Sequence, residues 1–291
     1  MKVIGFLNSA SDDIAFAAHV AAFRNGLKEN GYVDGENVHV ISRWAEGDYK
    51  NLPKLAADLV NSQVDLIATT GGTVSALAAL KATKTLPVLF VSGFDPEQAG
   101  LLQYGNATGV NVSTTLTVPE RATLLRQLVP KADKIADLLR PKTFVYEREK
   151  EQAKKAKLIV VETESGNDDL RQAFGDAVKK GAGALMVCAD PYFTSQYQQI
   201  VALAKEFHLP TAFAWRQYVE DGGLMSFGPR LSEAYFQIGA YAGLILKGIK
   251  PDALRVQTPK PDEFELVVNG STARTLNVEI PRGFDPRLEV I

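Results

Sequence analysis

Residues 64–91 read VDLIATTGGTVSALAALKATKTLPVLFV, and this stretch indicates the fold class. An apolar run over residues 64–68 is followed by a polar turn with two glycines at 69–73. Residues 74–82 are rich in alanine and leucine, which is typical of a helix, and residues 86–91 form a second apolar run. A helix between two buried strands makes a β-α-β unit, which requires the two strands to be parallel.

The same alternation continues in both directions from this unit. Toward the N-terminus, strands are predicted at 3–7 and 38–41 and helices at 16–27 and 52–60. Toward the C-terminus, a second series has helices at 119–129, 144–157, 169–180 and 195–207, and strands at 135–139, 158–161, 184–188, 211–214 and 224–227. A helix at 231–246, a strand at 264–268 and a short helix at 271–276 follow.

The predicted class is therefore α/β, with two doubly wound parallel-sheet lobes. A strand near 108–112, followed by a stretch rich in serine and threonine, marks the boundary between the two series. We expect lobe 1 at 1–114 and lobe 2 at 115–228. Residues 229–291 are expected to be a crossover helix and a C-terminal segment shared by both lobes, part of it returning to lobe 1.

The composition narrows the classes of protein that fit. The chain has 291 residues, a formal net charge of −2 and 46% hydrophobic residues. The balanced charge argues against a nucleic-acid partner, since proteins that bind DNA or RNA are usually basic. No apolar run is long enough for a transmembrane helix. The opening apolar run, 3–7, is too short for a signal-peptide core, so we expect a cytosolic protein or an exported one that has lost its leader.

Small polar residues, glycines, an aromatic ring and a carboxylate follow the predicted strands of the first series, at the sheet edge where parallel α/β proteins bind ligands. These include Asn8 and Ser9, then Thr70, Gly71, Gly72 and Thr73, and then Ser92, Phe94 and Asp95. Free backbone N–H groups at a helix start, together with two hydroxyls, suit a carboxylate or phosphate. A tight turn with a threonine N-cap is the alternative for 70–73. Neither a Walker A loop nor a GxGxxG motif is present, so no cofactor is expected.

Charged and aromatic residues follow other predicted strands. Asp95 and Asp190 each precede a proline, where a carboxylate either holds a ligand ammonium group or forms an Asx turn. Arg140 and Arg216 are able to clamp a carboxylate, although a solvated arginine is the alternative for each. Aromatic rings in or near these loops favour an aromatic-lined cleft, although each ring alone also fits a core: Phe16, Trp44, Phe94, Tyr192, Phe193 and Trp215.

Catalysis and metal binding find no support in the sequence. The three histidines, His19, His39 and His208, have no metal-ligand spacing, so no metal site is expected. Cys188 is the only cysteine, which excludes an intramolecular disulfide, and its apolar setting predicts a buried, inert thiol. No nucleophile–base pair is recognisable, and we predict no catalytic residues.

Six stretches, in order along nearly the whole chain, carry a family resemblance: VIGFLN at 3–8, FRNGLKENGY at 23–32, RWAEG at 43–47, PVLFV at 87–91, GGLMSFG at 222–228 and FELVVN at 264–269. The sequence resembles the substrate-binding proteins of ABC importers, in the group that includes tryptophan- and phenylalanine-binding members. This resemblance implies the type I periplasmic-binding fold, in which three crossing strands form a hinge between two lobes. It implies an exported protein without catalytic activity.

The resemblance also implies roles for the strand-end residues. The loop at 70–73 is expected to grip the ligand carboxylate, and Asp190 or Asp95 to meet the amino group. Arg140 stands where the family commonly has an Asn-Pro pair, so the polar contacts of lobe 2 are expected to differ. The predicted ligand-binding residues are Asn8, Ser9, Trp44, Thr70, Gly71, Gly72, Thr73, Ser92, Phe94, Asp95, Arg140, Asp190, Tyr192, Phe193 and Trp215.

The leading functional hypothesis is a periplasmic or otherwise extracytoplasmic solute-binding component of an ABC importer. Its solute is expected to be a small carboxylate with an aromatic or large apolar part, such as an aromatic amino acid, held as the two lobes close. The expected partners are this small molecule and an ABC permease, and a monomer is sufficient. A ligand sensor that presents its solute to a membrane receptor is one alternative, and an enzyme on the same scaffold is another.

Overall fold

The computed structural model describes residues 1–164 and 167–291. They form two compact units, which we call lobe 1 (residues 1–113 and 231–259) and lobe 2 (residues 114–230 and 260–291). The chain therefore passes from one unit to the other at three places. The shared C-terminal segment divides at residue 259, with the long helix in lobe 1 and the remainder in lobe 2.

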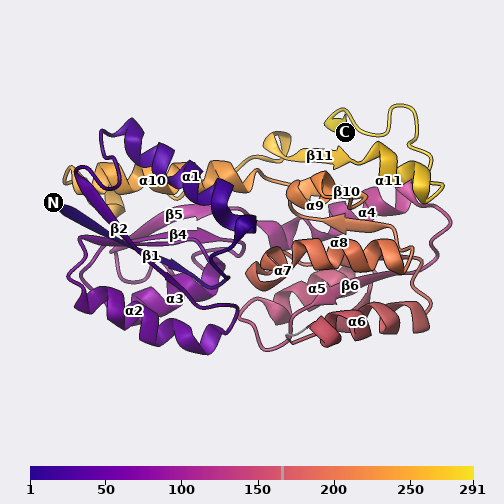
Figure 1. The fold of residues 1–291 in the computed structure, drawn as a ribbon, viewed down its shortest axis with the longest axis horizontal. Helices are drawn as coiled ribbons and strands as arrows, with labels where there is room; N and C mark the ends of the chain where they lie inside the picture. Colours follow the sequence, from indigo (N-terminus) through magenta and orange to yellow (C-terminus); the bar gives the residue numbers. More distant parts are fainter. Residues whose placement is uncertain (165–166) are drawn as a thin grey trace. The chain divides into compact units, whose positions relative to one another are not determined.

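Lobe 1 contains a five-stranded sheet in the order β2-β1-β3-β4-β5, all parallel. Its strands are β1 (Lys2–Asn8), β2 (Val38–Trp44), β3 (Leu66–Thr69), β4 (Val88–Ser92) and β5 (Ala107–Asn111). Its helices are α1 (Ile14–Glu29), α2 (Leu52–Asn61), α3 (Gly72–Ala82) and α10 (Leu231–Leu246). Helices α2 and α3 cover one face of the sheet and α1 and α10 the other (Figure 1).

The two faces of the lobe 1 sheet are packed differently. Under α2 and α3, aliphatic side chains such as Leu59, Ile67 and Leu80 form a buried core. On the other face, α1 and α10 approach so closely that glycine is required at the crossing. A Cβ atom on Gly26 would lie 2.0 Å from the carbonyl oxygen of Phe236, and one on Gly239 2.0 Å from that of Phe23.

Lobe 2 contains a sheet in which the described strands are ordered β12-β11-β10-β9-β8-β6-β7. They are β6 (Ile135–Leu139), β7 (Ile159–Glu162), β8 (Ala184–Val187), β9 (Thr211–Phe213), β10 (Met225–Gly228), β11 (Glu265–Val268) and β12 (Leu288–Val290). The helices are α4 (Val118–Leu128), α5 (Tyr146–Lys155), α6 (Asn167–Lys179), α7 (Pro191–Ser195), α8 (Tyr197–Glu206), α9 (Gln217–Glu220) and α11 (Gly270–Thr275). Apolar residues of α4 and α5, including Leu125 and Ala153, pack on one face of this sheet.

The predicted α/β class with two parallel-sheet lobes is confirmed, with three corrections in lobe 2. Strand β11 runs antiparallel to β10, because the chain leaves the lobe after β10 and the two strands do not belong to one local β-α-β unit. The helix expected at 195–207 is confirmed as α8, whereas the short helices α7 and α9 were not expected. Strand β12, which pairs with β11, was not expected.

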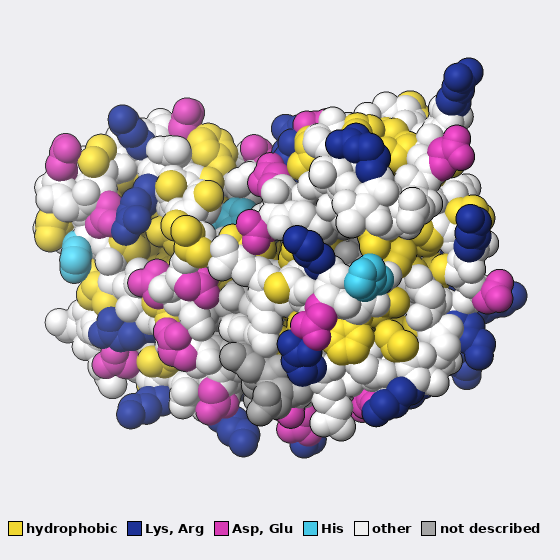
Figure 2. Space-filling model, turned by 45° about the vertical axis from the view of Figure 1, so that its right-hand side comes forward, with side chains coloured by type: hydrophobic (Ala, Val, Ile, Leu, Met, Phe, Trp, Pro, Cys, Tyr) yellow, Lys and Arg dark blue, Asp and Glu magenta, His cyan; other side chains and the backbone are white. Residues whose placement is uncertain are grey.

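The division into lobes differs slightly from the expected one. The boundaries lie at 113/114 and 230/231, against expected boundaries at 114/115 and 228/229. In the described part of the chain, no helix has the length and apolar character needed to cross a bilayer. Acidic and basic side chains are interspersed over the face drawn in Figure 2.

Candidate functional site

The carboxyl ends of β1 and β3 in lobe 1 are joined by side-chain hydrogen bonds. Asn8 Nδ2 donates to Thr70 Oγ1 at 3.1 Å and to the hydroxyl of Tyr235 on α10 at 3.2 Å. The Tyr235 hydroxyl donates to the carbonyl oxygen of Thr70 at 3.2 Å, and Ser9 Oγ donates to that of Gly71 at 2.7 Å. All four side chains are buried, so they fix the turn between β3 and α3 from behind.

The two glycines of this turn are required by its geometry. A Cβ atom on Gly71 would lie 2.1 Å from the Ser9 backbone nitrogen, and Gly72 has a φ of +75°. Among the residues that the structure describes, the backbone N–H groups of Gly71, Gly72 and Thr73 have no hydrogen-bond acceptor. These N–H groups, at the positive end of the α3 dipole, suit an anion.

Ser92, at the end of β4, holds the neighbouring loop. Its hydroxyl donates to the Phe94 carbonyl oxygen at 2.7 Å and accepts from the Phe94 N–H at 3.2 Å. Because the single Ser92 proton is used there, the 2.8 Å hydrogen bond between Ser92 and Thr73 has the Thr73 hydroxyl as its donor. Thr73 is thereby oriented with its lone pairs available as acceptors.

Asp95 and Trp44, in lobe 1, interact with residues other than those of the β3–α3 turn. Asp95 Oδ1 accepts from the N–H groups of Glu97 and Gln98 at 2.9 and 3.0 Å, which is the Asx-turn alternative. The Trp44 ring packs on Phe6 and Phe16, with centroid distances of 5.8 and 6.0 Å. Neither residue is hydrogen-bonded to the β3–α3 turn.

In lobe 2, the structure brings Asp190 and Arg140 together from two strand ends. Asp190 is 4% exposed and is the N-cap of α7, accepting from the Tyr192 N–H at 2.9 Å. The same oxygen lies 3.4 Å from Arg140 Nη1. The Arg140 guanidinium lies 4.6 Å from the centre of the Tyr192 ring, and its Nε donates to the carbonyl oxygen of Glu164 at 2.8 Å. A buried carboxylate thus shares its site with a cation and an aromatic ring.

The remaining candidate binding residues of lobe 2 are Phe193, Trp215 and Arg216. The Phe193 ring is fully buried 5.7 Å from the Tyr192 ring, so it supports Tyr192 from within the lobe. Trp215 follows β9 and is 7% exposed. Arg216, the alternative carboxylate clamp, already forms ion pairs with Glu220 and Glu289, and its pKa is raised by hydrogen bonds to these two side chains.

Behind Asp190 lies a buried group of ionisable residues that sequence reasoning missed: Arg121 on α4, Asp137 on β6, Glu149 on α5 and Cys188 after β8. Burial raises the pKa of Asp137 to about 7, against the opposing charge of Arg121. Burial and then the charges of Asp137 and Asp190 raise the pKa of Glu149 to about 8. Burial also lowers the pKa of Arg121 and raises that of the Cys188 thiol.

A signal for this cluster was present in the sequence. Asp137 interrupts the apolar run at 135–139, and Arg121 lies within the helical pattern at 119–129. Charged residues in buried positions are rare unless they are paired. Tyr235, the other missed residue, lies in an apolar helix pattern that gives no sign of a link to a turn far away in sequence.

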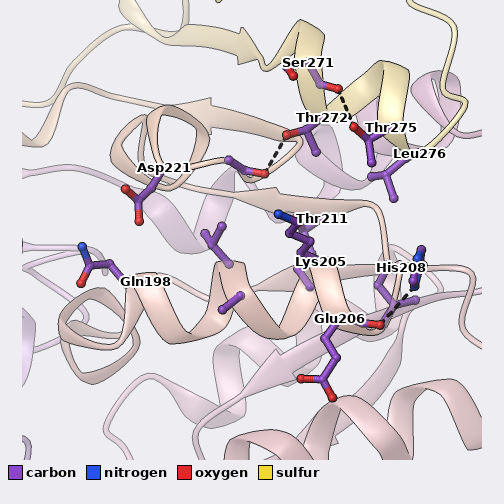
Figure 3. Close-up of a pocket in the computed structure, with 15 residues that line it drawn as sticks. Gln198, Lys205, Glu206, His208, Thr211, Asp221, Ser271, Thr272, Thr275 and Leu276 are labelled. Carbon is purple, nitrogen blue, oxygen red and sulfur yellow. Dashed lines mark hydrogen bonds between the residues drawn. The ribbon is translucent and has the colours of Figure 1, made fainter.

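A separate cavity of about 790 Å³ lies in lobe 2, lined by α8, α11 and the start of β9 (Figure 3). Hydroxyls that line it are used locally: Thr272 Oγ1 donates to the Gly222 carbonyl oxygen at 2.8 Å and Thr275 Oγ1 to that of Ser271 at 3.1 Å. None of the predicted site residues lines this cavity, which lies at the opposite end of β9 from the strand-end residues.

Comparisons with known proteins place the chain in a family. Residues 4–284 match the family model described as ABC transporter substrate binding protein. The chain belongs to this family. This chain is 28% identical over 265 residues to the tyrosine-binding protein of Clostridioides difficile (strain R20291), and the alignment covers 88% of this chain and 76% of the relative.

Two solved structures resemble this chain over nearly its whole length. A conserved domain protein from Vibrio cholerae O1 biovar eltor has a TM-score of 0.86 at 25% identity, covering 99% of both chains. The ABC domain in complex with L-Trp from Streptococcus pneumonia has a TM-score of 0.83 at 25% identity, covering 99% of this chain and all of that one. The predicted family and the periplasmic-binding-protein-like fold are confirmed. Contact of the predicted site residues with a solute stays a prediction.

Proposed function

We propose that this protein is the extracytoplasmic solute-binding component of an ABC importer and that its solute is an aromatic amino acid. The observation that carries the proposal is that the two lobes offer complementary binding groups. Lobe 1 offers a helix start suited to a carboxylate, and lobe 2 offers a buried carboxylate beside an aromatic ring. A zwitterionic solute with an aromatic part complements both. The tyrosine-binding relative and the relative in complex with L-Trp support this choice.

In this proposal the β3–α3 turn binds the solute carboxylate. The N–H groups of Gly71, Gly72 and Thr73 are the donors, and Asn8, Ser9 and Ser92 hold the turn that presents them. No lysine or arginine is required, because N–H groups at a helix start already favour an anion.

In this proposal Asp190 binds the solute ammonium group, and the Asp190 carboxylate is shared between this group and Arg140. One oxygen of the Asp190 carboxylate accepts from the Tyr192 N–H and lies 3.4 Å from the Arg140 guanidinium. Tyr192 and Trp215 then enclose the apolar part of the solute. The permease partner, the extracytoplasmic location and a monomeric state belong to the same proposal.

Calorimetry and thermal unfolding with matched solutes test the proposal. The panel contains L-tyrosine, L-tryptophan and L-phenylalanine, then tyramine, which lacks the carboxylate, and 4-hydroxyphenylacetate, which lacks the ammonium group. An amino acid at 100 times its Kd stabilises the folded state by about 2.7 kcal/mol, and the two truncated solutes are expected to stabilise it far less. The protein is first unfolded and refolded to remove any co-purified ligand.

Two aspartates provide a matched pair of variants, since each precedes a proline and caps a turn. Asn keeps the cap and removes the charge. Asp190→Asn is expected to weaken amino-acid binding by about 1.5–3 kcal/mol, whereas Asp95→Asn leaves it unchanged. Absence of binding by every aromatic amino acid refutes the solute assignment. Equal binding by 4-hydroxyphenylacetate removes the ammonium role of Asp190 and favours an aromatic carboxylate paired with Arg140.

A further inference from the structure

The cavity between α8 and α11 in lobe 2 is lined by two separate stretches of the chain. One stretch lies within residues 198–222, before the chain passes to lobe 1, and the other is 271–276, after it returns. The volume of about 790 Å³ falls within the range of about 300–1,000 Å³ that is typical of small-molecule pockets. The proposed function leaves this cavity unused, because none of its predicted site residues lines it.

The lining of the cavity is apolar where it is most deeply buried. Val201 and Ala204 on α8 and Leu209 before β9 are buried, and Leu276 at the end of α11 is half-buried. An apolar ligand group placed against these side chains displaces water from them, which favours binding.

Thr211, at the start of β9, adds a polar group to this lining. It is 1% exposed, and in the described part of the chain its hydroxyl has no hydrogen-bond partner. The hydroxyls of Thr272 and Thr275, which line the same cavity, are bonded to nearby carbonyl oxygens. A buried hydroxyl without a partner is costly, so a ligand acceptor that reaches Thr211 gains a hydrogen bond without breaking one.

Lys205, in the last turn of α8, supplies a positive charge. Figure 3 shows its side chain extending from α8 toward α11, and no described residue forms an ion pair with it. The Glu206 carboxylate points away and is bonded to Arg171 on α6 at 2.8 Å. Asp221 lies at the other end of the cavity, near Gln198 (Figure 3). The end of the cavity at Lys205 therefore favours an anion.

We propose that this cavity is a second binding site, separate from that of the proposed function, and that its ligand is a monocarboxylate with an apolar chain. The carboxylate accepts from the Thr211 hydroxyl and pairs with the Lys205 ammonium group. The apolar chain lies against Val201 and Leu209. Because such a ligand binds only the folded lobe, it stabilises lobe 2 by mass action.

Decanoate is the probe, because it has neither the ring nor the ammonium group of an aromatic amino acid. Calorimetry is expected to show one site per chain, with an affinity that saturating L-tryptophan does not change. Decyltrimethylammonium, which has the same chain and the opposite charge, is expected not to bind. Nuclear Overhauser effects from decanoate to the methyl groups of Val201 and Leu209 locate the bound chain. Absence of decanoate binding, or its displacement by L-tryptophan, overturns the proposal whether or not any aromatic amino acid binds.

Matched variants test the polar end of the site. Thr211→Val is expected to weaken decanoate binding about tenfold, without lowering the melting temperature of the free protein, since no hydrogen bond is lost there. Thr275→Val, in the same cavity, keeps full affinity because its hydroxyl is already bonded to the Ser271 carbonyl oxygen. Lys205→Met weakens binding by up to about fivefold, whereas Lys154→Met on α5 does not change it. Equal affinities for Thr211→Val and Thr275→Val overturn the placement of the carboxylate in this cavity.

Discussion

The two lobes present opposite kinds of chemistry at their strand ends. In lobe 1 the candidate site consists of backbone N–H groups, hydroxyls and an amide, all held by neutral hydrogen bonds around Asn8, Thr70 and Tyr235. In lobe 2 it consists of an ion pair, Asp190 with Arg140, above a buried group of further charges. Under the proposed function, lobe 1 recognises the solute by the position of its hydrogen-bond donors, and lobe 2 recognises it by charge.

This difference has physical consequences for stability. Neutral groups that are fully hydrogen-bonded cost little to bury and do not titrate near neutral pH. Buried charges are costly unless they are balanced, and their balance changes with pH. Substitutions in lobe 1 should therefore change stability through packing, by an amount that does not depend on pH. Substitutions of the buried charges in lobe 2 should change stability by an amount that depends on pH.

The largest effect is expected from breaking the charge balance of lobe 2. Arg121→Met removes the only cation among the buried group of Asp137, Glu149 and Cys188, leaving acidic groups uncompensated. The free energy of unfolding at pH 7.5 is expected to fall by about 3–5 kcal/mol. Urea denaturation monitored by fluorescence measures it. Addition of Asp137→Asn should recover part of the loss, and an equal loss in the double variant contradicts the charge argument.

A smaller effect, confined to lobe 2, is expected in the pH dependence of stability. In the folded state Glu149 holds its proton up to a pKa of about 8, whereas an unfolded glutamate has a pKa near 4.5. The folded state thus binds more protons between these values, so this contribution is full below pH 4.5 and is lost as the pH rises toward 8. Glu149→Gln should flatten the decline by up to about 1.4 kcal/mol per pH unit, measured by urea denaturation from pH 5 to 7.5. A slope equal to that of the wild type contradicts the prediction.

The same contrast explains what the sequence could predict. The β3–α3 turn was found because its glycines and hydroxyls follow an apolar run directly, and its chemistry is local in the chain. Asp190 and Arg140 were both named, but their pairing was not, because it depends on two strand ends separated by 50 residues. The same reason hid Tyr235, whose hydroxyl meets Asn8 across 227 residues.

The fold was predicted further than the site. Apolar runs alternating with helical patterns gave both lobes, since each local β-α-β unit requires a parallel sheet. Strand β11 failed this rule because it pairs with β10 after the chain has passed through α10 of the other lobe. The buried cluster was not predicted, because charged side chains are expected at the surface. Arg121 and Asp137 lie inside, where each charge partly offsets the cost of burying the other.

In lobe 1, the tight packing of the β3–α3 turn can be tested by adding one Cβ atom to Gly71. Gly71→Ala places a Cβ atom 2.1 Å from the Ser9 nitrogen and is expected to lower the free energy of unfolding by about 2 kcal/mol and to abolish solute binding. Gly175→Ala on α6, where a Cβ atom meets nothing within 4 Å, should instead stabilise by up to about 1 kcal/mol. The Gly71→Ala loss should be the same at pH 6 and pH 8. A loss of stability that varies with pH would contradict the conclusion that uncharged groups alone hold this turn.

The smallest effect comes from one hydroxyl behind the β3–α3 turn. Tyr235→Phe removes the donor to the Thr70 carbonyl oxygen and one acceptor of Asn8, at an expected cost of about 1 kcal/mol in stability. Because the turn is then held less firmly, affinity for a carboxylate solute should fall severalfold. Tyr241→Phe on the same helix removes a hydroxyl that donates to Arg255 and accepts from Gln257, away from the turn. That variant should lose similar stability and keep full affinity in calorimetry. Equal affinities for the two variants would mean that Tyr235 supports the fold of lobe 1 and not the position of its N–H groups.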